Sequence, residues 1–294
     1  MIKKILNYIK LLLELCKFKI TSFVALSTFV GYILYSKELS INMILPVIGV
    51  FILACGSSSL NHYQERFTDA LMSRTCKRPI PSGRISANHA LILSIAIIII
   101  SLTIIYFTTN IVSLILSLLA LIWYNFFYTP LKKKIAMAVV PGSLIGALPP
   151  MIGYTSAGGS PFDYQILALA LFFFIWQIPH FWLLLLIFNN DYQKANFPTL
   201  TKIFSNEQLS RITFIWIVSL SVCSYFIFLL DYSFKIYSVI ALIVLSIWLI
   251  IESSRLLLKY SEKSFLKETF LRINLYVLAV ITVISIDRLL FKEI

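Results

Sequence analysis

The sequence predicts an all-α fold, that of a polytopic membrane protein. Hydrophobic residues make up 59% of the 294 residues and charged residues only 13%, whereas soluble domains carry about 25% charged residues. The mean hydropathy of +0.89 agrees with this class. The apolar residues are gathered into nine runs, each long enough to cross about 30 Å of hydrocarbon as a helix.

The nine expected spans follow one another with polar loops between them. They cover residues 19–36, 43–60, 89–108, 111–128, 138–156, 165–188, 213–230, 234–251 and 273–290. No loop is long enough to hold a separate soluble domain. Residues 1–294 are therefore expected to form a single transmembrane domain.

Basic residues alternate from loop to loop. Of the 25 Lys and Arg residues, 21 fall in the N-terminal segment and in every second loop, and four in the other segments. Because cytoplasmic loops carry the excess of Lys and Arg, we expect a cytoplasmic N-terminus and, after nine crossings, an external C-terminus. The loops account for the net charge of +12, so no nucleic-acid partner is expected. This pattern indicates a multi-pass protein in contact with the lipid bilayer, and the missing presequence adds the expectation of a bacterial inner (cytoplasmic) membrane.

The N-terminal stretch, residues 1–18, is basic and amphipathic. Its apolar run is broken by Glu14 and Lys17, and no small-residue cleavage site of the kind found in signal peptides follows. We expect an interfacial helix that lies on the membrane surface.

A dense polar stretch, NHYQERFTDALMSRTCKRPIPSGR, separates the second run from the third. Asn61, Glu65 and Asp69 are spaced at i, i+4 and i+8, so a helix would align them on one face, about one turn apart. Hard oxygen ligands suit Mg²⁺, which takes one or two protein carboxylates and completes its shell with phosphate and water. The spacing predicts a magnesium site at the inner edge of the membrane. The alternative is an interfacial helical turn paired to neighbouring arginines.

The same stretch continues with four cations. They are Arg74, Lys77, Arg78 and Arg84. Beside oxygen ligands for a metal, such cations are suited to neutralising phosphate groups. The alternative is anchoring to anionic lipid, which any inner loop can provide.

Further candidate residues are expected at the same membrane face. The sixth run is followed by a second polar loop, which contains Asp191. Because the second run is also followed by a polar loop, we expect a parallel internal repeat, with two bundles of four helices plus one helix. Both polar loops would then meet at one cavity. Tyr128 and Lys132 lie at the inner end of the fourth run, where Pro130 is expected to end the helix.

Two runs carry residues that are unusual within a membrane. The fifth run is interrupted by Pro141, Pro149 and Pro150, and irregular helices occur at membrane depth where they are packed in protein or line a cavity. In the sixth run, His180 lies within WQIPHFW, and an ionisable residue at such depth is a site candidate. A hydrogen bond to a backbone carbonyl freed by Pro179 is the alternative.

These motifs resemble those of the UbiA superfamily of membrane prenyltransferases. The first motif of that superfamily, NxxxDxxxD, is matched by Asn61, Glu65 and Asp69, with Glu65 where Asp is usual. The RTxxRP continuation, YTPLK from Tyr128 and GALPPMIGY from Gly146 also match. PHFW, which begins at Pro179, points to the branch that uses haem. The resemblance covers nearly the whole chain.

The resemblance implies a magnesium-dependent prenyltransferase. It would transfer a farnesyl group from farnesyl diphosphate to a vinyl group of protohaem IX (haem B), giving haem O. The resemblance implies that Asn61, Glu65, Asp69 and Asp191 bind the metal. It implies that Arg74, Lys77, Arg78 and Arg84 bind the diphosphate. It assigns further catalytic contacts to Tyr128, Lys132 and His180, and His180 would also contact the haem. Many relatives carry a paired DxxxD motif in the second loop, whereas here Ala195 follows Asp191 at i+4.

Two other functions are open at this point. A superfamily prenyltransferase acting on a quinone precursor would share most of these motifs, although PHFW argues against it. A transporter would also have broken helices and polar residues within the membrane, although the ionic motif lies at the membrane edge and not at the midplane. Assembly partners in a terminal oxidase are a further expectation.

Overall fold

The computed structural model describes residues 2–230, 233–260 and 262–291, and every regular element in them is helical. The long helices are α2 (Phe18–Ser36), α3 (Ile44–Leu71), α4 (Ala87–Thr108), α5 (Ile111–Ile122), α9 (Tyr164–Ile187), α11 (Asn206–Leu229), α12 (Ile236–Ser254) and α13 (Lys263–Leu290). The short elements are α1 (Ile2–Leu15), α6 (Thr129–Leu131), α7 (Val139–Gly142), α8 (Leu144–Ser156), α10 (Asn189–Lys194), the π-helix η2 (Trp123–Tyr128) and the 3₁₀ turns η1 (Ile41–Met43), η3 (Leu200–Lys202) and η4 (Arg255–Leu257).

The predicted all-α membrane fold is confirmed. In the described part of the chain, eight helical segments are long and apolar enough to cross a membrane. The fifth expected span consists instead of α7 and α8, which meet at Ser143. Pro141 lies beside the break, whereas Pro149 and Pro150 are accommodated inside α8. This run thus consists of two short helices packed within the protein, and the interruption that its composition predicted is confirmed.

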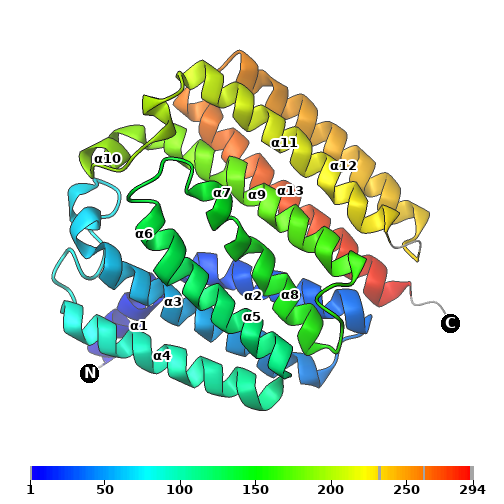
Figure 1. The fold of residues 1–294 in the computed structure, drawn as a ribbon, viewed down its shortest axis with the longest axis horizontal. Helices are drawn as coiled ribbons and strands as arrows, with labels where there is room; N and C mark the ends of the chain where they lie inside the picture. Colours follow the sequence, from blue (N-terminus) through cyan, green and yellow to red (C-terminus); the bar gives the residue numbers. More distant parts are fainter. Residues whose placement is uncertain (1, 231–232, 261, 292–294) are drawn as a thin grey trace.

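The two halves of the chain repeat one packing order. In the first half α2 packs on α3, α3 on α4 and α4 on α5, and in the second half α8 packs on α9, α9 on α11 and α11 on α12. Helix α2 also packs along α8, and α13 contacts α9, α12 and α2, which joins the halves (Figure 1). This arrangement agrees with two bundles of four helices plus one.

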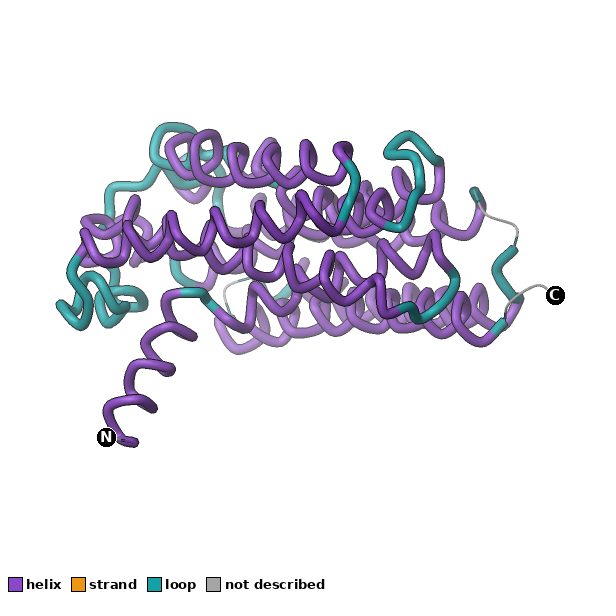
Figure 2. Tube along the Cα trace, turned by 90° about the horizontal axis from the view of Figure 1, so that it is seen from below, coloured by secondary structure: helices purple, strands orange, loops and turns teal. Residues whose placement is uncertain are grey.

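The polar loops gather at one end of the bundle. The segments that follow α3 and α6 lie with α10 at the left of Figure 1, whereas the C-terminus lies at the opposite end. In Figure 2, α1 projects away from the long helices at the end where the loops lie. The two polar motifs of the sequence are thus brought to one face of the molecule.

Helices α2 and α8 approach so closely that their backbones are in contact. A Cβ atom added at Gly31 would lie 1.9 Å from the carbonyl oxygen of Pro150, and one at Gly153 would lie 1.9 Å from that of Thr28. Small residues allow membrane helices to approach in this way. The contact fixes the first half of the chain against the broken span of the second.

We expect Gly153→Ala to lower the free energy of unfolding by about 1–3 kcal/mol, because the added methyl group overlaps backbone that cannot move away. Gly49→Ala is the matched control, since its methyl group first meets a side-chain carbon of Ile105 at 2.9 Å. Thermal unfolding in detergent measures both variants. Equal stability of the two variants would contradict the backbone contact.

Candidate functional site

Helix α3 continues beyond the apolar run and carries the polar motif on its last turns. It ends at Leu71, not near residue 60 as expected for the second span. Asn61, Glu65 and Asp69 are 0%, 6% and 1% exposed. The sequence therefore predicted the helical spacing, and the structure shows that these polar groups are buried against protein.

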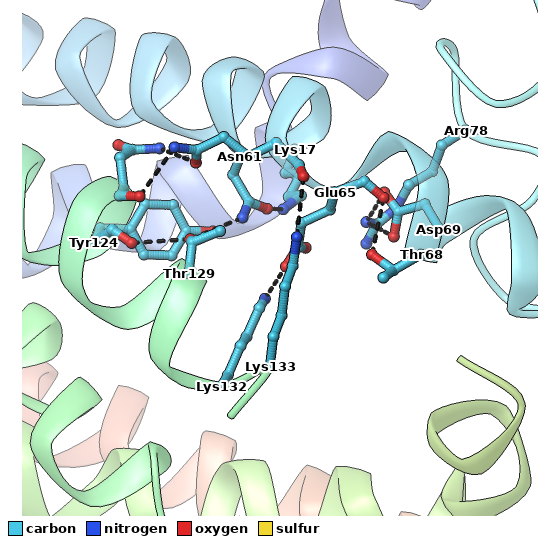
Figure 3. Close-up of polar contacts among 12 residues, drawn as sticks. Lys17, Asn61, Glu65, Thr68, Asp69, Arg78, Tyr124, Thr129, Lys132 and Lys133 are labelled. Atoms are coloured by element: carbon cyan, nitrogen blue, oxygen red, sulfur yellow. Dashed lines mark hydrogen bonds and ion pairs between the residues drawn. The ribbon is translucent and has the colours of Figure 1, made fainter. Parts of the chain in front are cut away.

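The two carboxylates on α3 are each paired with a cation from another segment (Figure 3). Lys132 Nζ lies 2.5 Å from Glu65 Oε1, and Arg78 Nη1 lies 2.8 and 2.7 Å from the two carboxylate oxygens of Asp69. Burial lowers the pKa of Lys132, but Glu65 and then Tyr128 outweigh it, and the pKa lies above its ordinary value. Lys132 is therefore positively charged beside Glu65.

Asn61 is held by the turn between α1 and α2. Lys17 Nζ donates to Asn61 Oδ1 at 2.8 Å, and Asn61 Nδ2 donates to Thr129 Oγ1 at 3.1 Å. Lys17 has a left-handed backbone, with φ 49° and ψ 52°, which turns the chain from α1 into α2. Burial, and then the charge of Arg78, lower the pKa of Lys17 to about 7. The three predicted metal ligands on α3 each have a basic side chain from outside this helix beside them.

The loop between α3 and α4 is fastened to α10 by Asp191. The backbone N–H groups of Ser73 and Arg74 donate to Asp191 Oδ1 and Oδ2 at 3.2 and 3.0 Å. Burial raises the pKa of Asp191, but these hydrogen bonds hold it below its ordinary value. Both oxygens of the second-loop carboxylate thus hold the loop in place, and each keeps a lone pair with which it can bind a metal.

A cationic pocket of about 230 Å³ opens beside α3. Its lining consists of Glu14, Lys17, His62, Arg74, Lys77, Arg78 and Pro79. Three of the four cations predicted to hold a diphosphate are in this lining. The fourth, Arg84, lies outside it and pairs with Glu14 at 2.6 Å. His62 is 1% exposed, and neither ring nitrogen has a hydrogen-bond partner among the described residues.

The fourth span ends at Leu131, directly after Pro130, as expected, and a π-helical turn precedes the proline. The N–H group of Thr129 bonds to the carbonyl of Tyr124, five residues earlier. Asn125 fastens this turn to α3: it accepts from Ser57 Oγ at 2.5 Å and donates to Gln64 Oε1 at 3.1 Å. The wider turn relieves the clash that Pro130 would cause in an α-helix.

The π-helix turns two aromatic rings toward the polar groups of α3. The rings of Tyr124 and Tyr128 are stacked, with centroids 6.1 Å apart. Lys132 Nζ lies 5.3 Å from the centre of the Tyr128 ring. The ring of Phe181 on α9 lies 6.3 Å from that of Tyr128. Tyr128 therefore connects the Lys132–Glu65 pair with α9.

His180 lies on α9 among aromatic rings. The rings of Trp176, Phe181 and Phe270 lie at centroid distances of 4.9, 5.4 and 4.6 Å from its imidazole. Its Nδ1 atom is 2.9 Å from Asn274 Oδ1 on α13. The partner of His180 is thus a side chain of the last helix and not a carbonyl freed by the neighbouring proline.

The fold and the site together define a multi-pass membrane protein. At one end of its helical bundle, a buried helix face with several oxygen ligands lies beside basic side chains from other segments. Residues 24–275 match the model of the UbiA prenyltransferase family, and the chain belongs to this family.

Two relatives from different bacteria have the same protein name. The chain is 46% identical over 153 residues to a protein of Geobacter sulfurreducens named protoheme IX farnesyltransferase, an alignment that covers 52% of this chain and 56% of that protein. It is 39% identical over 197 residues to the protein of the same name from Aquifex aeolicus, with 66% of this chain and 67% of that one covered. The aligned part of this chain thus spans little more than half the length of the first relative.

Solved structures share the fold. The structure described as digeranylgeranylglyceryl phosphate synthase superposes with a TM-score of 0.77 at 19% identity, covering 96% of this chain and 99% of that one. A UbiA homologue from Archaeoglobus fulgidus, bound to GPP and Mg²⁺, has a TM-score of 0.61 at 16% identity and covers 94% of this chain and 99% of that one.

Four residues of the site were not found from the sequence. They are Lys17, Tyr124, Thr129 and Asn274. Lys17 was assigned to the membrane-surface helix, and Tyr124 lies one helical turn before Tyr128 but was not singled out. Thr129 and Asn274 have no distinguishing local pattern, because their partners lie in distant segments.

We expect Asp191→Ala to loosen the loop between α3 and α4, because the N–H groups of Ser73 and Arg74 lose both acceptors. Hydrogen exchange at these two amides should accelerate by about tenfold or more, as befits the loss of hydrogen bonds worth ~1.5–3 kcal/mol to a charged group. Asn190→Ala, at the exposed neighbouring position, is the control. Unchanged exchange in Asp191→Ala would refute the loop-positioning role.

Proposed function

We propose that this protein transfers the farnesyl group of farnesyl diphosphate to a vinyl group of haem B, giving haem O. The observation that carries the proposal is the buried face of α3, where Asn61, Glu65 and Asp69 lie beside cations from three other segments. The names of the similar proteins support haem as the acceptor and farnesyl as the transferred group.

The donor set of α3 fits Mg²⁺. Asn61, Glu65 and Asp69 offer only oxygen atoms, and the described residues contain no group of three or more His, Cys, Asp or Glu that could hold a metal. Mg²⁺ needs no such group, since it takes one or two carboxylates and fills its shell with substrate phosphate and water. When bound, the ion would supply positive charge to the diphosphate leaving group.

The cations of the site would change partners when the donor binds. Lys132 and Arg78 now neutralise Glu65 and Asp69. When the donor is bound, the two carboxylates would serve as metal ligands. Lys132 and Arg78 would then pair with phosphate oxygens of the donor. The two cations would then stabilise the negative charge that develops on the departing diphosphate. Arg74 and Lys77, which line the neighbouring pocket, would neutralise the remaining phosphate charge.

The reaction begins with cleavage of the bond between C1 of the farnesyl group and the diphosphate oxygen. The bonding electrons leave with the diphosphate, and an allylic cation remains. The terminal vinyl carbon attacks C1, water adds to the inner vinyl carbon, and one proton is lost, leaving a hydroxyethylfarnesyl chain. The rings of Tyr128 and Phe181 would stabilise the cation by about 0.5–2 kcal/mol each. His180 would contact the haem or accept the proton.

The placement of the protein in the cell is part of the same proposal. The excess of Lys and Arg at the end with the polar loops supports a site on the cytoplasmic side of a bacterial inner membrane. Helix α1 would then lie at the lipid interface as part of a single domain. Haem O formed there would be passed to terminal-oxidase assembly partners.

Product analysis tests the proposed function. Purified protein in lipid nanodiscs, supplied with Mg²⁺, farnesyl diphosphate and haem B, should form a haem whose mass has increased by one farnesyl group and one hydroxyl group. Prenylation of an aromatic quinone precursor, with haem unchanged, would reassign the acceptor. Absence of diphosphate release with either acceptor would contradict prenyl transfer and favour transport.

We expect Asp69→Asn to reduce turnover by at least about 100-fold, because it removes one charged metal ligand and the partner of Arg78 without changing the side chain's shape. Glu207→Gln, on the exposed start of α11, is the matched control and should retain activity. Diphosphate release measures both variants, and the unfolding temperature confirms that both are folded. Activity of Asp69→Asn within about twofold of the control would remove Asp69 from the metal site.

A further inference from the structure

The side-chain amide of Asn274 has only one orientation that satisfies both of its neighbours. Its Nδ2 group donates to the carbonyl oxygen of Phe270, one turn earlier on α13, at 2.6 Å. An amide oxygen in that position would face another acceptor. Oδ1 must therefore point the other way, and there it lies 2.9 Å from His180 Nδ1.

This orientation determines which nitrogen of His180 carries the proton. Oδ1 of an amide can only accept, so Nδ1 of His180 must donate. In a neutral imidazole, Nε2 then bears the free lone pair. Among the described residues, Nε2 of His180 has no hydrogen-bond partner. It is not one of the fully buried atoms without a partner, so its surface is partly accessible. The lone pair is therefore available to a ligand.

A chain of contacts leads from this nitrogen to the polar face of α3. The imidazole contacts the ring of Phe181, which contacts that of Tyr128. Tyr128 lies beneath Lys132, the partner of Glu65. These successive contacts link His180 to the Lys132–Glu65 pair across the two halves of the bundle.

We propose that Asn274 is a positioning residue, which holds His180 with Nε2 unprotonated so that this nitrogen can bind the iron of the acceptor haem. This inference rests on the proposed function and adds a specificity element to it. A neutral imidazole nitrogen is a common iron ligand, and the second nitrogen of such a histidine usually donates to an acceptor that fixes its tautomer and its angle. Helix α13, which packs against both bundles of four, would thereby select the acceptor.

Haem titration tests the ligand role. The full chain in nanodiscs is titrated with ferric haem B, and the Soret band is recorded. We expect His180→Ala to abolish the histidine-ligated spectrum and added imidazole to restore it. Asn274→Leu should weaken haem binding by about 10–100-fold, whereas Asn274→Asp, which keeps an acceptor for Nδ1 but loses the donor to the Phe270 carbonyl, should weaken it less. Thr282→Leu, exposed on the same helix, is the control, and the Kd of farnesyl diphosphate should not change in any variant.

Nitrogen-15 NMR of the three histidines tests the tautomer without haem, with His180→Ala used for assignment. The wild type should show His180 protonated at Nδ1, and Asn274→Leu should shift it toward the Nε2–H form. A wild-type His180 protonated at Nε2, or a folded Asn274→Leu variant with unchanged haem affinity and spectrum, would overturn the positioning role. A wild type that binds no haem would instead overturn the proposed acceptor, and the ligand role with it.

Discussion

The site depends on the pairing of buried carboxylates with cations from other parts of the chain. Glu65 and Asp69 lie on α3 with 6% and 1% exposure, and an ionised carboxylate without a partner at such burial would be strongly destabilising. Their partners, Lys132 and Arg78, come from the segments after α6 and α3. The same contacts that neutralise the site therefore also fasten these segments to α3.

The second half of the chain completes the site from across the bundle. Asp191 on α10 holds the loop between α3 and α4 through two backbone N–H groups. Helix α9 contributes His180, and α13 contributes its partner Asn274. The close backbone contact between α2 and α8 fixes the distance between the halves. A two-bundle architecture thus places a polar motif of the first half opposite an aromatic, histidine-bearing wall of the second.

Periodicity and composition predicted most of the fold and the central row of the site. Spacing alone placed Asn61, Glu65 and Asp69 on one helix face, and three prolines predicted a broken fifth span. Lys17 could not be found in this way, because its contact with Asn61 joins residues 44 positions apart. The π-helix was missed for a related reason. Pro130 correctly indicated the helix end, but the π-helical turn before it is fastened by contacts of Asn125 with Ser57 and Gln64, which no local pattern shows.

The role of Asp191 shows how far residue type can predict chemistry. A carboxylate in the second polar loop suggested a metal ligand, and the structure shows in addition that both of its oxygens accept backbone N–H groups of a distant loop. The metal role of Asp191 stays a prediction, and its contact with this loop could not be predicted from residue type. The most direct test is calorimetric: farnesyl diphosphate binding measured with Mg²⁺ and with a chelator, in wild type and Glu65→Gln. Mg²⁺ should tighten wild-type binding by about tenfold or more, equivalent to ~1.4 kcal/mol, and this gain should vanish in Glu65→Gln. Equal affinity with and without Mg²⁺ in the wild type would contradict a metal site on α3.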